Sequence, residues 1–308
     1  MTKGYVEVTS MQKSSPYSLL FSLLLLLAVL PVAVPTAGLA DNRPAADSAA
    51  ASQEVVDYPF EILSREHGGL LIAEVSGEID YPYASIRKVL TEPDTWCDFL
   101  PLVFNIKSST YRRQAGQYFL TLYLGRKFYE PPEKAIQLEY KFDVRRNDDN
   151  ALQILLSAAD GPYGTSDYTI RIDVNAAGEN RTKVRMHSSF RPSLASQVAT
   201  RLYLLTLGRN KVGFSVTGFK EGKPVYCRGI KGIVERNAMR YYFAIKSYLD
   251  TLQLPASQRF EARLNNWYDL TDRYHKQLYE MDKPTYLAAK RKERLGQMQL
   301  QEQTTSAL

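Results

Sequence analysis

The chain has few residues of the types that build metal centres and disulfide frameworks. Its 308 residues include only three histidines and two cysteines, Cys97 and Cys227. A structural zinc site takes four ligands from such residues, so this small set argues against a metal centre. The sequence also lacks a Gly-x-Ser-x-Gly elbow, a His-Glu-x-x-His pair, a phosphate-binding Gly-Lys-Ser/Thr loop and a dinucleotide glycine fingerprint. We therefore expect no cofactor and favour a non-catalytic protein, although an enzyme that acts by positioning alone leaves no such motif.

No dense stripe of arginine and lysine with interleaved aromatic residues occurs, which disfavours nucleic acid as a partner. The formal net charge is +6, and the first forty residues hold two lysines against one glutamate, so residues 41–308 keep +5. A balance of this size is compatible with contact with anionic lipid or acidic partners.

The first forty residues have the layout of a secretory signal peptide. Lys3 and Lys13 precede the apolar run LLFSLLLLLAVL at 19–30, and small residues follow up to Ala40. Pro31 and Pro35 follow the run and break helical continuity. The apolar stretch is therefore shorter than the roughly 20 residues that a membrane-spanning helix needs. We expect cleavage after Ala40 and a periplasmic or secreted protein. Residues 41–56 are rich in alanine, serine and aspartate, as in a flexible leader.

The expected export affects whether the two cysteines can form a disulfide. An oxidising compartment permits a disulfide between Cys97 and Cys227, and two buried free thiols are the alternative. The sequence leaves both open, because a bridge needs Cα atoms within about 7 Å of each other.

Short segments with strand patterns follow one another from residue 70 to residue 190. The clearest is 136–145, where Leu138, Tyr140 and Phe142 alternate with charged or polar residues, which predicts one buried and one wet face. Two short helices interrupt the series at 84–90 and 94–99, and residues 233–252 form a long amphipathic helix. The predicted strands are 70–79, 103–110, 118–125, 136–145, 152–159, 168–174 and 182–190.

Two further segments do not belong to this series. Residues 193–231 form an insertion that holds a helix at 194–207 and a hairpin or ordered loop around Lys220-Glu221-Gly222-Lys223. Residues 254–308 form a helical C-terminal extension with a heptad-like stripe from Phe260 to Met281 and a basic cluster, Lys290-Arg291-Lys292. The stripe needs a surface to pack on. That surface is either the protein's own sheet and closing helix, or a second chain that contacts residues 256–281. The basic cluster is either a solvated face or a contact with anionic headgroups.

Several of these features together resemble the START-like superfamily of polyketide cyclases and lipid-transport proteins, also called SRPBCC. They are the strand end at 74–80, Tyr81-Pro82 opening a helix, Val89-Leu90, the turn from Trp96 to Pro101 and the helix 234–252. The resemblance implies an α+β helix-grip fold in residues 57–253, a curved antiparallel sheet of about seven strands around a long C-terminal helix. It also implies an internal cavity for a lipid or another hydrophobic small molecule.

A curved sheet held away from one helix leaves space that a ligand can fill. We predict as ligand-binding residues Trp96, Phe99, Leu122, Tyr140, Phe142, Tyr168, Met186, Tyr241 and Ile245. Plain core packing is the alternative for each of them. Asp160-Gly161-Pro162-Tyr163-Gly164 is either a loop at the pocket mouth or a hairpin turn.

The leading hypothesis is an exported, non-catalytic protein that binds or carries such a molecule. The alternatives are an interaction or assembly protein that uses the C-terminal stripe, and an enzyme of the cyclase or aromatase type.

Overall fold

The computed structural model describes residues 58–206 and 208–306, so the predicted signal peptide (1–40) and leader (41–56) lie outside the described residues. In chain order the elements are β1 (Phe60–His67), β2 (Leu70–Ile79), α2 (Tyr83–Thr91), α3 (Pro93–Phe99), η1 (Leu100–Leu102), β3 (Ile106–Gln114), β4 (Gln117–Leu124), η2 (Pro132–Lys134), β5 (Ile136–Asn147), β6 (Ala151–Asp160), η3 (Pro162–Gly164), β7 (Ser166–Ala176), β8 (Thr182–Arg191), α4 (Leu194–Leu205), β9 (Val216–Lys220), β10 (Lys223–Tyr226), α5 (Gly229–Asp250), α6 (Ala256–Asp272), α7 (His275–Leu278) and α8 (Lys283–Ser306).

One antiparallel sheet organises the molecule. Its eight strands follow the order β1-β2-β8-β7-β6-β5-β4-β3. All seven predicted strands occur, and β1 is an eighth that the sequence pattern did not predict. It pairs with β2 in register from Phe60 with Gly77 to His67 with Leu70. The hairpin turn between them uses Gly68 and Gly69, whose φ angles of +58° and +76° favour glycine.

The alternation predicted for β5 is present. Leu138, Tyr140 and Phe142 are buried, whereas Gln137 and Glu139 are exposed. Side chains alternate between the faces of a strand, so every second residue of β5 points to the concave side of the sheet. This side holds the core.

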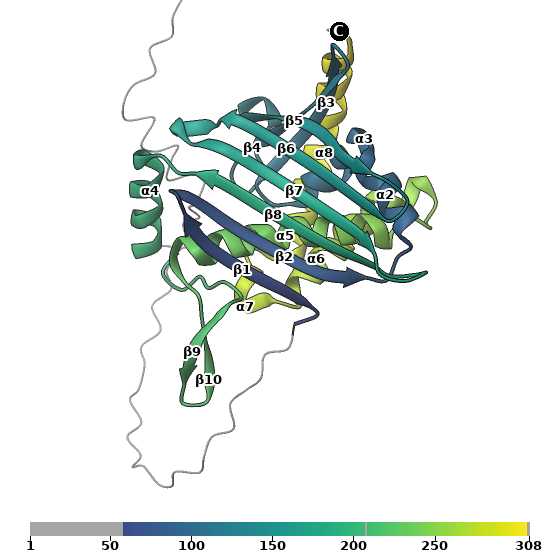
Figure 1. Ribbon diagram of the computed structural model, residues 1–308. Helices are drawn as coiled ribbons and strands as arrows, with labels where there is room; N and C mark the ends of the chain where they lie inside the picture. The colour runs from purple at the N-terminus through teal and green to yellow at the C-terminus, as the bar shows by residue number, and fades with distance from the viewer. Residues whose placement is uncertain (1–57, 207, 307–308) are drawn as a thin grey trace, which may run out of the picture.

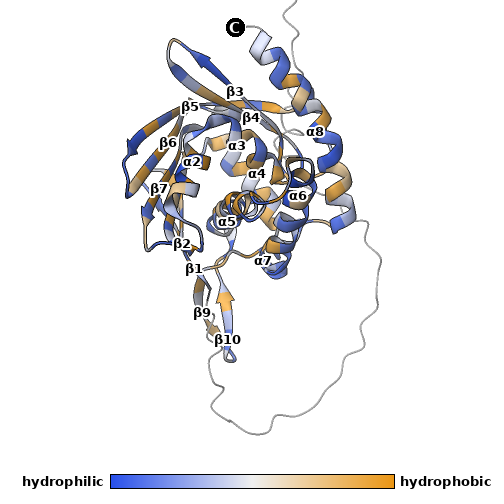
Figure 2. Ribbon diagram, turned by 90° about the vertical axis from the view of Figure 1, so that its right-hand side faces the viewer, coloured by the Kyte–Doolittle hydropathy of each residue, from blue (hydrophilic) through white to orange (hydrophobic). Residues whose placement is uncertain are grey.

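Helix α5 lies against the concave side of the sheet (Figures 1 and 2). It packs on β1 and β2 with one side and on α6 with another, and α8 packs along strand β3. Most sides of α5 are therefore buried. Its residues Ala238, Met239 and Leu249 are each at most 1% exposed. The α+β architecture of a curved sheet around a long helix is confirmed.

The insertion contains the predicted helix as α4 and the predicted hairpin as β9–β10. Glu221 and Gly222 form the hairpin turn with positive φ angles of 52° and 74°. The insertion is tied to the core through Glu235 of α5. The carboxylate of Glu235 is fully buried and accepts hydrogen bonds from the backbone N–H groups of Phe214 and Ser215 and from the hydroxyl of Ser64.

The C-terminal extension packs on the protein itself. Leu264, Trp267 and Leu278 are at most 1% exposed, and the Trp267 indole N–H donates to the Arg240 carbonyl at 3.1 Å. The apolar stripe is therefore covered by the same chain. This corrects the alternative in which residues 256–281 offer that stripe to a second chain.

The basic cluster at 290–292 is solvated only in part, because Arg291 and Lys292 are exposed and Lys290 is buried. Lys290 is buried and donates to Glu293 and to the carbonyls of Val103 and Ile106. Arg291 pairs with Glu261, and Lys292 lies over the ring of Tyr129. Each of these cations thus has a partner within the molecule, and the headgroup contact considered for the cluster stays a prediction.

A second buried charge cluster joins α5 to the extension. The carboxylate of Glu280 pairs with Arg236, Arg240, Lys127 and Lys211. Burial raises the pKa of Glu280, but the four cations outweigh it and hold that pKa well below its usual range. The cluster ties the loop before β5 and the insertion to α5.

Candidate ligand-binding pocket

A cavity of about 270 Å³ lies between the concave face of the sheet and the N-terminal half of α5. The sheet contributes residues from β2, β4, β5, β7 and β8, and α5 contributes Ile233, Asn237 and Tyr241. The third wall comes from Ala199 and Thr200 of α4. The volume lies just below the range of about 300–1,000 Å³ that is typical of small-molecule sites.

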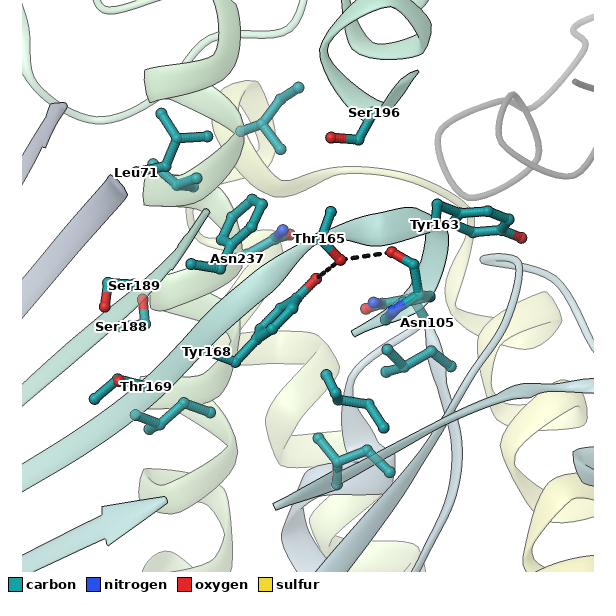
Figure 3. Close-up of a pocket in the computed structure, with 18 of the residues that line it drawn as sticks. Leu71, Asn105, Tyr163, Thr165, Tyr168, Thr169, Ser188, Ser189, Ser196 and Asn237 are labelled. Atoms are coloured by element: carbon teal, nitrogen blue, oxygen red, sulfur yellow. Dashed lines mark hydrogen bonds between the residues drawn. The ribbon is translucent and has the colours of Figure 1, made fainter. Parts of the chain in front are cut away.

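Aromatic side chains form part of the sheet wall. Tyr168 stacks on Phe190 with ring centroids 5.3 Å apart and meets Tyr140 edge to face at 6.4 Å. The Tyr168 hydroxyl lies 2.8 Å from Thr165 Oγ1, which donates to the Pro162 carbonyl. Figure 3 shows this chain of contacts at the edge of the pocket. It holds the Tyr168 ring in place along the cavity wall.

Amide and hydroxyl groups supply the polar part of the lining. Figure 3 shows Asn105 and Asn237 among them, with Ser188, Ser189 and Thr169 on the sheet side. Asn237 Oδ1 accepts a hydrogen bond from Arg240 at 3.2 Å, so its NH₂ group can donate elsewhere. These groups are suited to hydrogen bonding with a neutral polar part of a ligand.

The pocket holds no charged group. None of the described residues that line it is an aspartate, glutamate, lysine, arginine or histidine. Burial raises the pKa of Tyr241 to about 12 and the pKa of Tyr140 well above its usual value, and burial raises that of Tyr168 too. All three phenols are therefore neutral at physiological pH.

Four of the predicted ligand-binding residues line this cavity, namely Leu122, Tyr140, Tyr168 and Tyr241. The other five pack in the core outside it. Trp96 meets Phe99 and Phe142 through ring contacts of 5.2 and 5.5 Å, and its N–H donates to the Leu90 carbonyl. Met186 and Ile245 are each 1% exposed within the same core.

The wall from α4 and the polar groups Asn105 and Asn237 were not predicted. An apolar pattern over 194–207 predicted the helix but not which side would face the core. The loop at 160–164 does reach the cavity, because Pro162 and Tyr163 line it. Asn105 and Asn237 had no signal in the sequence, since single asparagines belong to many turns and helices.

The possible disulfide is not formed. Cys97 and Cys227 are both buried free thiols. The Cys97 carbonyl accepts from the Gln297 side chain of α8, whereas Cys227 lies at the base of the β9–β10 hairpin beside α5. Their positions in separate parts of the core explain the absence of a bridge. Among the described residues, no group of three histidine, cysteine or acidic residues is placed to hold a metal ion.

The sheet order and the closing helix match the architecture expected from the sequence. This is a helix-grip fold. No protein-family model matches the chain, and no curated protein matches it in sequence.

Several solved structures are similar at low levels. A STAR-related lipid transfer protein fragment from Xanthomonas axonopodis matches with 10% identity over 51% of this chain and 92% of its own, at a TM-score of 0.36. Norcoclaurine synthase from Thalictrum flavum matches with 17% identity over 51% of this chain and 99% of its own, at 0.30. A conserved protein of unknown function from Enterococcus faecalis matches with 11% identity over 69% and 91%, at 0.35. Scores of this size assign no function, so the function has to be inferred from the residues of this chain.

Proposed function

We propose that this protein binds one small, uncharged and mainly apolar molecule, or the apolar part of a lipid, and carries it without changing it chemically. The observation that carries this proposal is the cavity of about 270 Å³ with neutral walls between the sheet, α4 and α5. Each CH₂ group transferred from water into such a cavity gains about 0.8 kcal/mol. A charged group would lose its hydration there without gaining a counter-ion.

The polar lining selects among apolar ligands. Asn105 and Asn237 can each donate and accept hydrogen bonds, and they come from different walls of the pocket. A ligand with one carbonyl or hydroxyl group can therefore be oriented by an amide while its apolar body packs on Tyr140 and Tyr168. This combination is typical of sites in which a few polar groups set the orientation.

The lining does not favour acid–base catalysis. General acids and bases work best with a pKa near the operating pH. Burial places the pKa of Tyr241 at about 12, and none of the histidines lines the cavity. The carrier function therefore fits these walls better than a cyclase or aromatase function does.

We further propose that the protein acts outside the cytoplasm. Support comes from the order of Lys3 and Lys13, the apolar run at 19–30 and the small residues that end at Ala40. Export would place the carrier where an apolar molecule has to cross water.

Filling the cavity tests the proposed function. Ala199 lines the pocket from α4, whereas Ala195 lies on the same helix, is exposed and does not line it. We expect Ala199→Trp to abolish uptake of a neutral apolar fluorescent probe such as N-phenyl-1-naphthylamine, and Ala195→Trp to leave uptake unchanged. Circular dichroism spectra that match the wild-type spectrum establish that both variants fold. Equal uptake by wild type and Ala199→Trp would contradict binding in this cavity.

A further inference from the structure

Helix α4 is apolar on two opposite sides. Its inner side, with Ala199 and Tyr203, faces the pocket and the core, and both residues are at most 5% exposed. Residues three, four and seven positions apart share one side of a helix. By that spacing Leu194, Val198 and Leu205 lie together on the side opposite Tyr203.

The outer side is open to solvent. Leu194 is 82% exposed, Leu205 76%, Val198 54% and Leu202 45%. No element among the described residues covers this row of four. Scattered exposed leucines are ordinary, but a contiguous apolar row on one helix marks an interaction surface.

The hairpin of the same insertion adds further exposed apolar side chains. Val216, Phe219 and Val225 on β9 and β10 are 38% to 44% exposed. Figure 1 shows α4 at the left margin of the molecule, beside the ends of the strands, and the hairpin projecting below the sheet. We refer to these two elements and the loop between them, residues 194–231, as the insertion surface.

The insertion surface carries the positive charge of the protein. Residues 194–231 contain seven basic residues and one acidic residue, a net charge of +6, whereas residues 41–308 as a whole carry +5. Six of the seven are exposed and have no carboxylate partner among the described residues; they are Arg201, Arg209, Lys220, Lys223, Arg228 and Lys231.

Several arginines outside the insertion do have carboxylate partners. On the outer face of the sheet, Arg112 pairs with Glu139, Arg171 with Asp173 and Arg191 with Asp167. Exposed cations without a carboxylate partner also occur elsewhere, at Lys134 and Lys183 for example, but the insertion surface holds six of them, and Arg201 lies on α4 itself. A surface with apolar residues flanked by lysine and arginine is the chemistry that binds anionic lipid headgroups and the acyl boundary below them.

We propose that the insertion surface docks on a bilayer that contains anionic phospholipid, with the outer row of α4 entering the headgroup boundary. Helix α4 has 12 residues and would lie in the plane of the interface. The inner side of the same helix forms a wall of the pocket, so docking brings the cavity to the membrane. The surface binds lipid whether or not the cavity holds a ligand, so this inference stands apart from the proposed function.

Vesicle co-sedimentation tests the proposal. The protein used begins at Asp41, the N-terminus expected after cleavage of the signal peptide. We expect it to bind vesicles of phosphatidylcholine with added phosphatidylglycerol, to bind pure phosphatidylcholine vesicles much less, and to dissociate as salt is raised.

Two pairs of variants locate the contact. Leu194→Gln with Leu205→Gln should weaken binding about tenfold, since apolar area is lost from the bilayer. Lys220→Gln with Lys223→Gln should weaken binding about fivefold for each lysine removed. The matched controls, Leu295→Gln with Met298→Gln on α8 and Lys134→Gln with Lys183→Gln, also change exposed residues and should bind as wild type does.

The results distinguish a membrane from a second copy of the chain as the partner of the insertion surface. Absence of binding to anionic vesicles at low salt, or equal losses in the controls, would overturn the proposal. A wild-type chain that is dimeric without vesicles, and monomeric when Leu194 and Leu205 are glutamine, would instead assign the surface to a second copy. The pocket-filled variant Ala199→Trp should bind vesicles normally, so failure of the carrier function would not be mistaken for failure of docking.

Discussion

The hydroxyl of Tyr168 lies 2.8 Å from Thr165 Oγ1, and both residues line the pocket. Gly161 lies beneath the Tyr168 ring, and a Cβ atom added to Gly161 would meet ring atom Cε2 at 2.3 Å. The backbone of Gly161 is extended, with φ of −139°. Glycine is needed there for space and not for its conformational freedom.

Gly161→Ala should therefore displace the Tyr168 ring and lower the uptake of apolar probe. The expected loss of stability is about 1–3 kcal/mol, as for other overpacked sites. Gly218→Ala is the matched control, because nothing lies within 4 Å of its added Cβ. Probe titration and urea unfolding of both variants measure the effect, and identical behaviour of the two would show that Tyr168 has room to move.

Glu293→Gln should loosen the C-terminal extension. Lys107 Nζ lies 2.9 Å from Glu293 Oε1, and their side chains are 0% and 2% exposed. The substitution leaves Lys107 and Lys290 buried without a carboxylate, which typically costs about 3–5 kcal/mol. Urea unfolding measures the loss, with the exposed Glu302→Gln on the same helix as control. A loss no larger than that of the control would mean that the ion pair does not fasten α8 to the sheet.

Stability should rise between about pH 7 and pH 9. Burial lowers the pKa of Lys127 to about 7 and that of Lys290 to about 8, against carboxylates that raise both. In this window the unfolded chain still binds protons that the folded chain has released, so raising the pH favours the folded state. The slope is at most about 1.4 kcal/mol per pH unit for each lysine.

Lys127→Met isolates one of the two contributions. It should be tolerated at pH 7, because Arg236, Arg240 and Lys211 still neutralise Glu280. Unfolding free energies of wild type and variant over this pH range should show a shallower slope in the variant. An unchanged slope would assign the pH dependence to other groups.

Both cysteines should react as free thiols only after unfolding. Burial raises the pKa of Cys97 to about 12 and that of Cys227 to about 11, so neither is a thiolate at neutral pH. A thiol reagent should label two groups per chain in denaturant without reductant and very few in the native protein. Finding no reactive thiol in denaturant would mean that the two are bridged.

The proposed export predicts the N-terminus of the mature protein. When a bacterial host with a secretory pathway expresses the full chain, intact mass measurement should show a protein that begins at Asp41. Ala40→Phe places a large residue at a position that signal peptidase reads as small, and it should block this cleavage. Full-length protein retained in the cytoplasm in both cases would contradict export.

The sequence predicted the parts of the fold that follow from period-two and helical patterns. Strand β5 is the plainest example, because its alternation reflects one dry and one wet face. Strand β1 was missed since Glu61, Arg65 and Glu66 dominate it and only Phe60 is buried, as at the edge of a sheet. The burial of Lys290 and Glu293 was equally hidden, because two charged residues in a helix look solvated until a partner such as Lys107 is placed opposite.

The candidate site was predicted in part for a related reason. Concave-side residues such as Leu122 and Tyr140 follow from strand alternation. Which large side chains fill the space and which border a gap depends on packing between distant elements. Trp96 and Phe142 pack against each other in the core, whereas Tyr168 and Tyr241 border the cavity together with the small residue Ala199.

The carrier function is tested most directly by what the protein holds when it is purified from the compartment where it acts. Solvent extraction and mass spectrometry of wild type should recover one neutral, mainly apolar class of molecule in near-stoichiometric amount. Ala199→Trp should yield none, and Ala195→Trp should yield as much as wild type. Recovery of no such molecule from wild type over several growth conditions, or equal recovery from Ala199→Trp, would contradict the proposal.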